Sequence, residues 1–197
     1  MYRDEGFRFY NDLIEIVPTY EQTEITLMSA DHFQRMIDYM IWADRRVWAC
    51  IAALSDDDIA RPVAYSLGSL HEQVVHQMEV QWMWLERIKG ISTATLPTVL
   101  DYPTRESLVE RWTRTQEAWH NYVLALEDDD LRTTITYQRM RDNTTLELRL
   151  TDILAHVINH ATDHRSQMLA LIASYGGETF EQDYIFYVQS LPKEATS

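Results

Sequence analysis

The chain has 197 residues, the size of one ordinary domain, with 31 acidic side chains against 17 Lys and Arg. The formal charge of -14 disfavours binding to nucleic acids or anionic membranes, because such a surface repels phosphate groups. A single cysteine, Cys50, excludes an internal disulfide framework and a cysteine-rich metal site. No segment resembles a secretory signal or reaches membrane-spanning length, so we expect a cytoplasmic protein.

The beginning of the chain differs from the rest. Residues 1–27 contain short extended-looking segments and lack a sustained helical stripe, so we interpret them as an N-terminal extension of unknown role. Met28 and the residues after it are typical of a native start, which makes the extension an arm or a start-site artefact. No repeat or linker divides the remainder, and we expect one domain over 28–190 followed by a tail over 191–197.

Four amphipathic helices are predicted from apolar residues spaced three and four apart. The second should begin at Ser69, whose hydroxyl can cap the first turn while Glu72 reaches back in a capping box. The third should begin at Thr104, and the last should end at the glycine pair 176–177. The four expected helices cover residues 29–54, 69–90, 104–126 and 150–175.

The spacing of apolar residues is no longer helical in the segment before the last helix. Residues 134–137 and 145–148 are β-prone, and residues 141–143 between them can turn. We therefore predict an all-α fold, a four-helix bundle, with a small β-hairpin or extended insertion before the last helix.

The last helix carries histidines on its apolar face. His160 and His164 lie in the middle of the apolar stripe, and His156 lies on its edge. A pair spaced four residues apart can direct two ring nitrogens at one cation, at about 2.0 to 2.1 Å from each. The alternative is that they are core histidines hydrogen-bonded to carbonyls or to Asn159 and Gln167.

A metal site needs a third ligand from another helix. The second helix offers His71 on one flank of its apolar stripe and His76 on the other. Periodicity does not decide between them.

Several segments resemble the DinB/YfiT-like family. The run Leu70–His76, followed by Trp82–Gly90, resembles the second helix of that family, and His156–Gln167 resembles its metal-binding last helix. Tyr39–Asp44 is similar to its Tyr-x-x-Trp-Ala pattern, and Gly176–Tyr187 resembles its C-terminal closure around Asp183. The resemblance extends from residue 28 to about 190, and Ser166 departs from it because the family commonly has glycine there.

The resemblance implies that His76, His160 and His164 bind one metal ion. It also implies that His156 contacts these ligands without binding the ion itself. We interpret Asn159 as a further group behind the ligands or facing solvent. Arg165 and Gln167 are candidates to orient a cofactor or substrate, although an arginine on a helix is more often an ion-pair partner.

Three histidines leave a coordination position open, which is typical of a catalytic metal, and imidazole suits zinc, nickel or iron alike. Because some family members transfer low-molecular-weight thiols such as bacillithiol or use mycothiol, the resemblance implies a metal-dependent thiol S-transferase acting on a small-molecule substrate. The alternatives are a non-catalytic metal-binding stress-response module and a metal-dependent hydrolase. No catalytic side chain is identified, and the aromatic-rich helices favour a homodimer.

Overall fold

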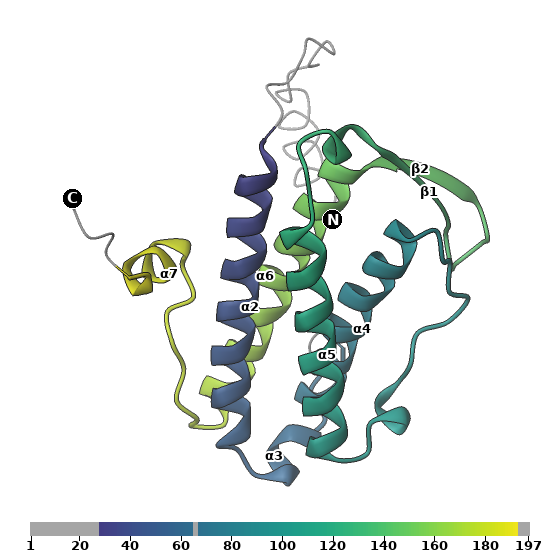
Figure 1. Cartoon of the computed structure of the whole chain (residues 1–197). Helices are drawn as coiled ribbons and strands as arrows, with labels where there is room; N and C mark the ends of the chain where they lie inside the picture. Colours follow the sequence, from purple (N-terminus) through teal and green to yellow (C-terminus); the bar gives the residue numbers. More distant parts are fainter. Residues whose placement is uncertain (1–27, 65–66, 193–197) are drawn as a thin grey trace, which may run out of the picture.

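The computed structural model describes residues 28–64 and 67–192, so the expected extension over 1–27 lies outside the described residues. Within these ranges the chain forms six α-helices and one two-stranded sheet (Figure 1). The helices are α2 (Ala30–Ala52), α3 (Asp56–Ala60), α4 (Leu70–Ile88), α5 (Arg105–Leu124), α6 (Leu150–Ser174) and α7 (Tyr184–Ser190), and the strands are β1 (Thr134–Gln138) and β2 (Thr145–Arg149).

The four long helices form a bundle. Both α2 and α4 pack against α5 and α6, which closes the four helices around a common core. The helices α4 and α5 run in the same direction, because the connection over 89–104 returns along the outside of the bundle (Figure 1). The predicted four-helix bundle is confirmed.

The helix starts follow the capping residues that the sequence indicates. The Ser69 hydroxyl accepts from the Glu72 backbone N–H at 3.1 Å, as predicted. The return bond from the Glu72 carboxylate is absent among the described hydrogen bonds, because this carboxylate lies against Gly68 instead. At the start of α5 the capping box is complete, with Thr104 and Ser107 each accepting from the backbone N–H of the other at 3.2 Å.

The expected β-hairpin is present before α6. Strands β1 and β2 pair in antiparallel register, and Asn143 adopts a left-handed φ of 57° in the turn between them. The hairpin lies beside α4, where the Arg87 guanidinium sits 4.6 Å from the ring centroid of Trp84 and 4.5 Å from that of Tyr137. These contacts fix the hairpin to the end of the bundle.

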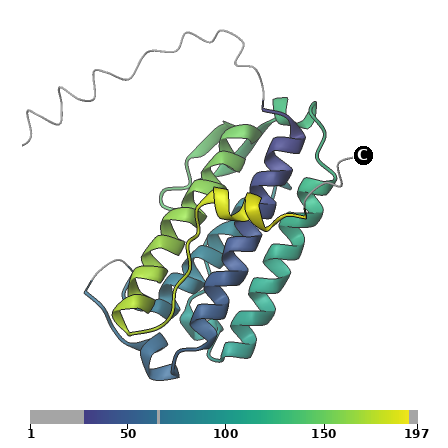
Figure 2. The same cartoon turned by 90° about the vertical axis from the view of Figure 1, so that its left-hand side faces the viewer.

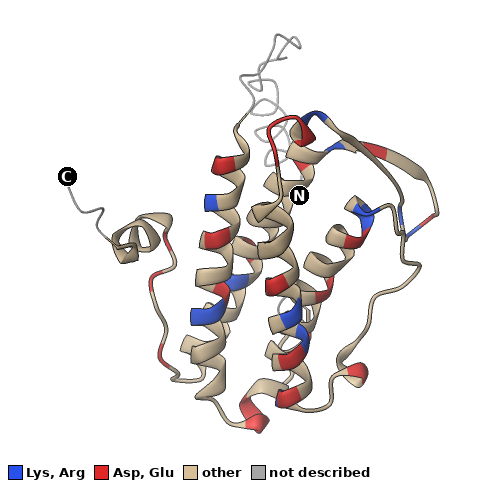
Figure 3. Cartoon of the chain, viewed as in Figure 1, with Lys and Arg blue, Asp and Glu red and all other residues tan. Residues whose placement is uncertain are grey.

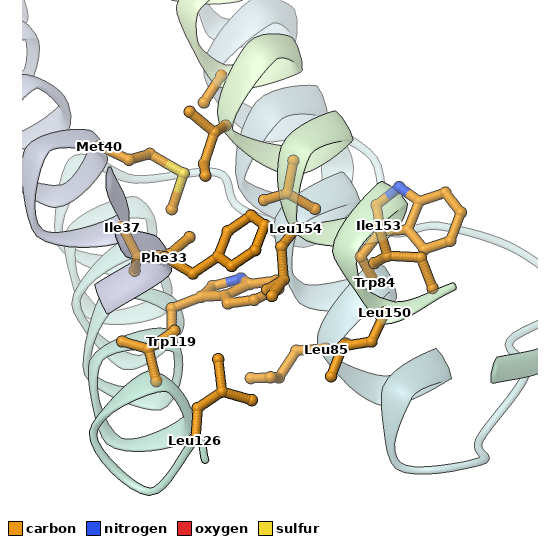
Figure 4. Packing of buried hydrophobic residues seen from close by; sticks show 14 of the residues in the cluster. Phe33, Ile37, Met40, Trp84, Leu85, Trp119, Leu126, Leu150, Ile153 and Leu154 are labelled. Atoms are coloured by element: carbon orange, nitrogen blue, oxygen red, sulfur yellow. The ribbon is translucent and has the colours of Figure 1, made fainter. Parts of the chain in front are cut away.

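The interior has two apolar clusters separated by a polar layer. Figure 4 shows the first cluster, in which Phe33, Trp119 and Leu154 pack together with side chains from all four long helices. The second cluster lies toward the opposite end of the bundle and contains Leu70 and Met168. Between the clusters, each long helix contributes buried polar side chains, namely Asp44, Gln73, Gln77, Gln81, Thr115, Gln116, His164 and Arg165. Such a layer needs hydrogen-bond partners for its polar atoms, which restricts how the helices can rotate.

The chain after α6 runs back along the bundle to α7, which packs on α2 (Figure 2). The Tyr39 hydroxyl donates to the Gln182 carbonyl at 2.8 Å, and its ring centroid lies 5.9 Å from that of Tyr187. The sequence indicated a closing segment here but did not predict α7 as a helix.

Surface charges are mixed rather than gathered by sign. Basic and acidic residues are interleaved along α2 and α5 instead of forming a continuous basic stripe (Figure 3). In the part of the chain that the structure describes, none of the helices combines the length and apolar character needed to cross a bilayer.

Candidate metal centre

Three histidines converge from two helices. His76 comes from α4, and His160 and His164 come from successive turns of α6, which packs against α4. One ring nitrogen from each lies within 4.8 Å of the other two. The ring centroids of His160 and His164 are 4.4 Å apart, and that of His76 lies 5.4 and 4.7 Å from them.

This arrangement fits a divalent metal ion. Nitrogens that bind one zinc at its usual distance lie about 3.3 Å apart, so small side-chain rotations would bring these rings into coordination. The Nδ1 atom of His160 is buried and has no hydrogen-bond partner among the described residues. A buried imidazole nitrogen without a hydrogen-bond partner costs free energy of folding. If the rings rotated toward a bound ion, their lone pairs would gain a partner.

A buried glutamine orients one of the histidines. Because an amide oxygen can only accept, the His164 Nδ1–H donates to Gln73 Oε1 at 2.9 Å, and Nε2 keeps its lone pair. The Gln73 amide in turn donates to Gln167 Oε1 at 3.1 Å, and the Gln167 amide donates to Asp163 at 3.0 Å. Gln73 therefore holds His164 in the form that a metal requires.

Burial keeps the cluster uncharged at neutral pH. Removal from water, reinforced by repulsion from His164, lowers the pKa of His76 to about 4. Burial and then the neighbouring histidines lower the pKa of His160 to about 3, and burial lowers the pKa of His164 as well. Neutral imidazoles present free lone pairs, so the protonation state of the cluster at pH 7 is compatible with a bound cation.

The same pKa shifts predict that the metal-free protein loses stability in mild acid. The ordinary histidine pKa is 6.5, so below this pH the unfolded chain binds more protons than the folded chain does. We expect the free energy of unfolding to fall by about 1 kcal/mol per pH unit from pH 6 toward pH 4.5, after allowance for solvent screening of half-buried rings. Urea unfolding with a chelator present measures this slope. His160→Ala should reduce it, and an unchanged slope in that variant would contradict the assignment.

The structure separates the two histidines of α4 that the sequence left open. His76 lies in the cluster, whereas His71 lies outside it and its Nε2–H donates to the Tyr102 carbonyl at 3.0 Å. The exposed His156 ring lies beside the cluster, 5.5 Å from the ring of His160. Asn159 is exposed and makes no hydrogen bond through its side chain within the described ranges.

Arg165 lies in the polar layer rather than in the histidine cluster. Its guanidinium is fully buried, pairs with Asp44 at 2.9 Å and donates to Gln182 and Thr162 at 3.0 and 2.9 Å. The sequence interpretation of a helical arginine as an ion-pair partner describes this position, and its partner Asp44 was missed. Gln167, the other candidate for orienting a ligand, reaches the cluster through Gln73.

A cleft of about 250 Å³ lies beside the cluster and has His76 in its wall. Residues of α4 form one side of this cleft, and residues from the segments before and after α4 complete it. An ion held by the three histidines would thus have neighbouring space for a second molecule.

Comparison with known proteins identifies the family. The model of the DinB family matches residues 28–195. The chain belongs to the DinB family. A crystal structure of a DinB-like protein from Bacillus cereus has a similar fold, with a TM-score of 0.59 and 17% sequence identity over 78% of this chain and 97% of that chain. A comparison with curated proteins finds no match.

For this DinB family member, the match covers the whole bundle and includes all three clustered histidines. The family and the fold that the sequence indicated are confirmed. The histidine cluster is compatible with a divalent metal.

Proposed function

We propose that this DinB family member is a metal-dependent enzyme that transfers a low-molecular-weight thiol to an electrophilic small molecule. His76, His160 and His164 would hold zinc, nickel or iron. The observation that supports this proposal is the convergence of three uncharged histidines beside an open cleft. Three protein ligands leave a coordination position for substrate.

A bound divalent ion would lower the pKa of a thiol or water at its open coordination position. The chain's own residues would orient the reaction. Gln73 fixes the tautomer of His164, and the cleft beside His76 receives the remainder of the thiol. Because burial raises the pKa of the Cys50 thiol, and Cys50 packs against the second apolar cluster, the attacking sulfur would come from a bound molecule.

Removal of the metal is therefore expected to abolish thiol conjugation. Protein purified without a metal-affinity tag would be stripped with a chelator, reloaded with zinc, nickel or iron, and assayed with small thiols and a chromogenic electrophile. His160→Ala should be inactive under all conditions. His120→Ala is the matched control, because His120 is exposed on α5 and contacts Asp38 instead of the cluster. Undiminished turnover in the stripped protein would contradict the proposal.

A non-catalytic metal-binding module, such as a stress-response protein, is the second candidate. It is favoured by the placement of the three histidines on two helices, since an ion at this site would tie α4 to α6. This candidate predicts that metal raises the Tm while no thiol or ester is turned over. Turnover of esters alone would instead indicate a metal-dependent hydrolase.

We also propose that residues 28–190 form the working domain, between an extension over 1–27 and a tail over 191–197, and that the protein acts in the cytoplasm as a homodimer. Exposed apolar side chains such as Leu124 on α5, with 59% of its surface accessible, support the dimer. Light scattering that gives the mass of a single chain would reject it.

A further inference from the structure

The cleft beside His76 has an apolar wall with one acidic side chain. Its apolar residues come from α4 and from the segments before and after this helix, and are Leu67, Val75, Leu96, Pro97 and Val99. Thr98 adds a hydroxyl, and Glu72 adds the only charge among the described residues that line it. The cleft thus suits a small molecule that combines an apolar portion with a polar or charged group.

Glu72 lies one helical turn before His76, so the two side chains project from the same face of α4. Its carboxylate occupies the space beside Gly68, where a Cβ atom would clash with it. Gly68 also has a φ of +105°, a conformation that other residues rarely adopt. A glycine at this position therefore allows the carboxylate to lie close to the backbone at the edge of the cleft.

The charge of Glu72 is available to a ligand. Its side chain makes no ion pair with any residue in the described ranges. By contrast, Glu79, which also lies on α4, pairs with Arg111 at 2.7 Å. No Lys or Arg lines the cleft within those ranges. A half-buried carboxylate without a cationic partner attracts a positive ligand group and repels a negative one.

The opposite wall is held in place independently of any ligand. The Tyr102 hydroxyl donates to Glu79 at 2.6 Å, and Arg111 donates to both carboxylate oxygens of Glu79 at 2.7 and 2.9 Å. The His71 ring donates to the Tyr102 carbonyl. These bonds tie the connection after α4 back onto the helix, so the cleft is preformed.

From this geometry, we propose that the cleft binds the carbon skeleton of the thiol and that Glu72 selects thiols bearing an ammonium group over thiols bearing a carboxylate. The inference rests on the proposed function and specifies its substrate class. Glu72 acts as a specificity-determining residue that contacts the charged end of the ligand, while His76, His160 and His164 would hold the ion near which the sulfur end lies.

Binding of three thiols with one two-carbon skeleton tests this selection. Cysteamine is cationic, 2-mercaptoethanol is neutral and mercaptoacetate is anionic. Each would be titrated into cobalt-loaded protein, and the thiolate-to-cobalt absorption band would report binding without any turnover. The quantity compared is the ratio of affinities between wild type and Glu72→Gln for each thiol, because this ratio cancels the intrinsic difference in thiol acidity.

Glu72→Gln is expected to weaken the binding of cysteamine about tenfold and to strengthen the binding of mercaptoacetate several-fold. The affinity for 2-mercaptoethanol should not change. Glu110→Gln, which removes an exposed carboxylate on α5, should change none of the three. Equal ratios for all three thiols would overturn the charge selection while leaving the proposed function intact. Loss of cobalt from Glu72→Gln would also overturn it, because Glu72 would then belong to the metal site. Failure of wild type to take up cobalt or zinc would reject the proposed function itself.

Discussion

Arg165→Met is expected to destabilise the protein by about 3–5 kcal/mol, because it leaves the Asp44 carboxylate buried without its counter-charge. Both side chains are 0% exposed. Burial raises the pKa of Asp44, and Arg165 opposes this rise together with amide hydrogen bonds from Gln77 and Gln81 at 2.8 and 3.1 Å. Of the groups that stabilise the charged form of Asp44 against burial, Arg165 contributes most, and the substitution removes it.

Urea unfolding at pH 7 measures this loss. The double variant Asp44→Asn/Arg165→Met should recover part of it, because the asparagine is neutral and keeps an oxygen for the surrounding amides. Arg114→Met, which breaks an exposed pair with Glu110, is the matched control and should change stability by less than about 0.5 kcal/mol. A loss below about 1 kcal/mol in Arg165→Met would show that this pair does not hold the polar layer together.

Gln73→Leu is expected to weaken metal binding by about 10- to 100-fold, although Gln73 is not expected to touch the ion. The leucine keeps the side chain's approximate volume but removes the oxygen that accepts from His164 Nδ1–H. Without that acceptor, the His164 ring can rotate or change tautomer, so Nε2 is directed at the ion for a smaller fraction of the time.

Competition with a chromophoric chelator gives the metal affinity of each variant. Gln116→Leu is the appropriate control, because Gln116 is also a buried glutamine of the polar layer but accepts from Arg45 on the other side of the bundle. Its metal affinity should match that of wild type. An unaltered affinity in Gln73→Leu would exclude an orienting role for this residue.

The helices could be predicted because the residues that determine each of them are close together in the sequence. Apolar residues three and four apart define the buried face of each long helix, and Ser69 and Thr104 cap the helices that they were expected to begin. The hairpin was predictable for the same reason, since its β-prone runs and its turn are adjacent in sequence.

Two of the three clustered histidines could be predicted in the same way, from local sequence. His160 and His164 lie four residues apart, and that spacing alone places them on one helix face. The third member could not, because both His71 and His76 lie on flanks of the same stripe and their environment depends on which helix packs against each flank. Only the family resemblance favoured His76.

The buried polar partners were beyond the reach of sequence patterns. Asp44 and Arg165 are separated by 121 residues, and Gln73 and His164 by 91, so no period or motif connects them. The available signal was the row of glutamines at 73, 77 and 81, which repeats every four residues on the inward face of α4. A polar residue repeated at that spacing within an apolar stripe indicates a polar layer in the core.

The metal content of the purified protein tests the central claim most directly. Elemental analysis would be run on protein made without a metal-affinity tag, in parallel for wild type, His160→Ala, His164→Ala and His120→Ala. We predict about one divalent ion per chain in wild type and in His120→Ala, and none in the other two variants. A wild-type protein that carries no metal and cannot be loaded with zinc, nickel or iron would contradict the metal site and the proposed function with it.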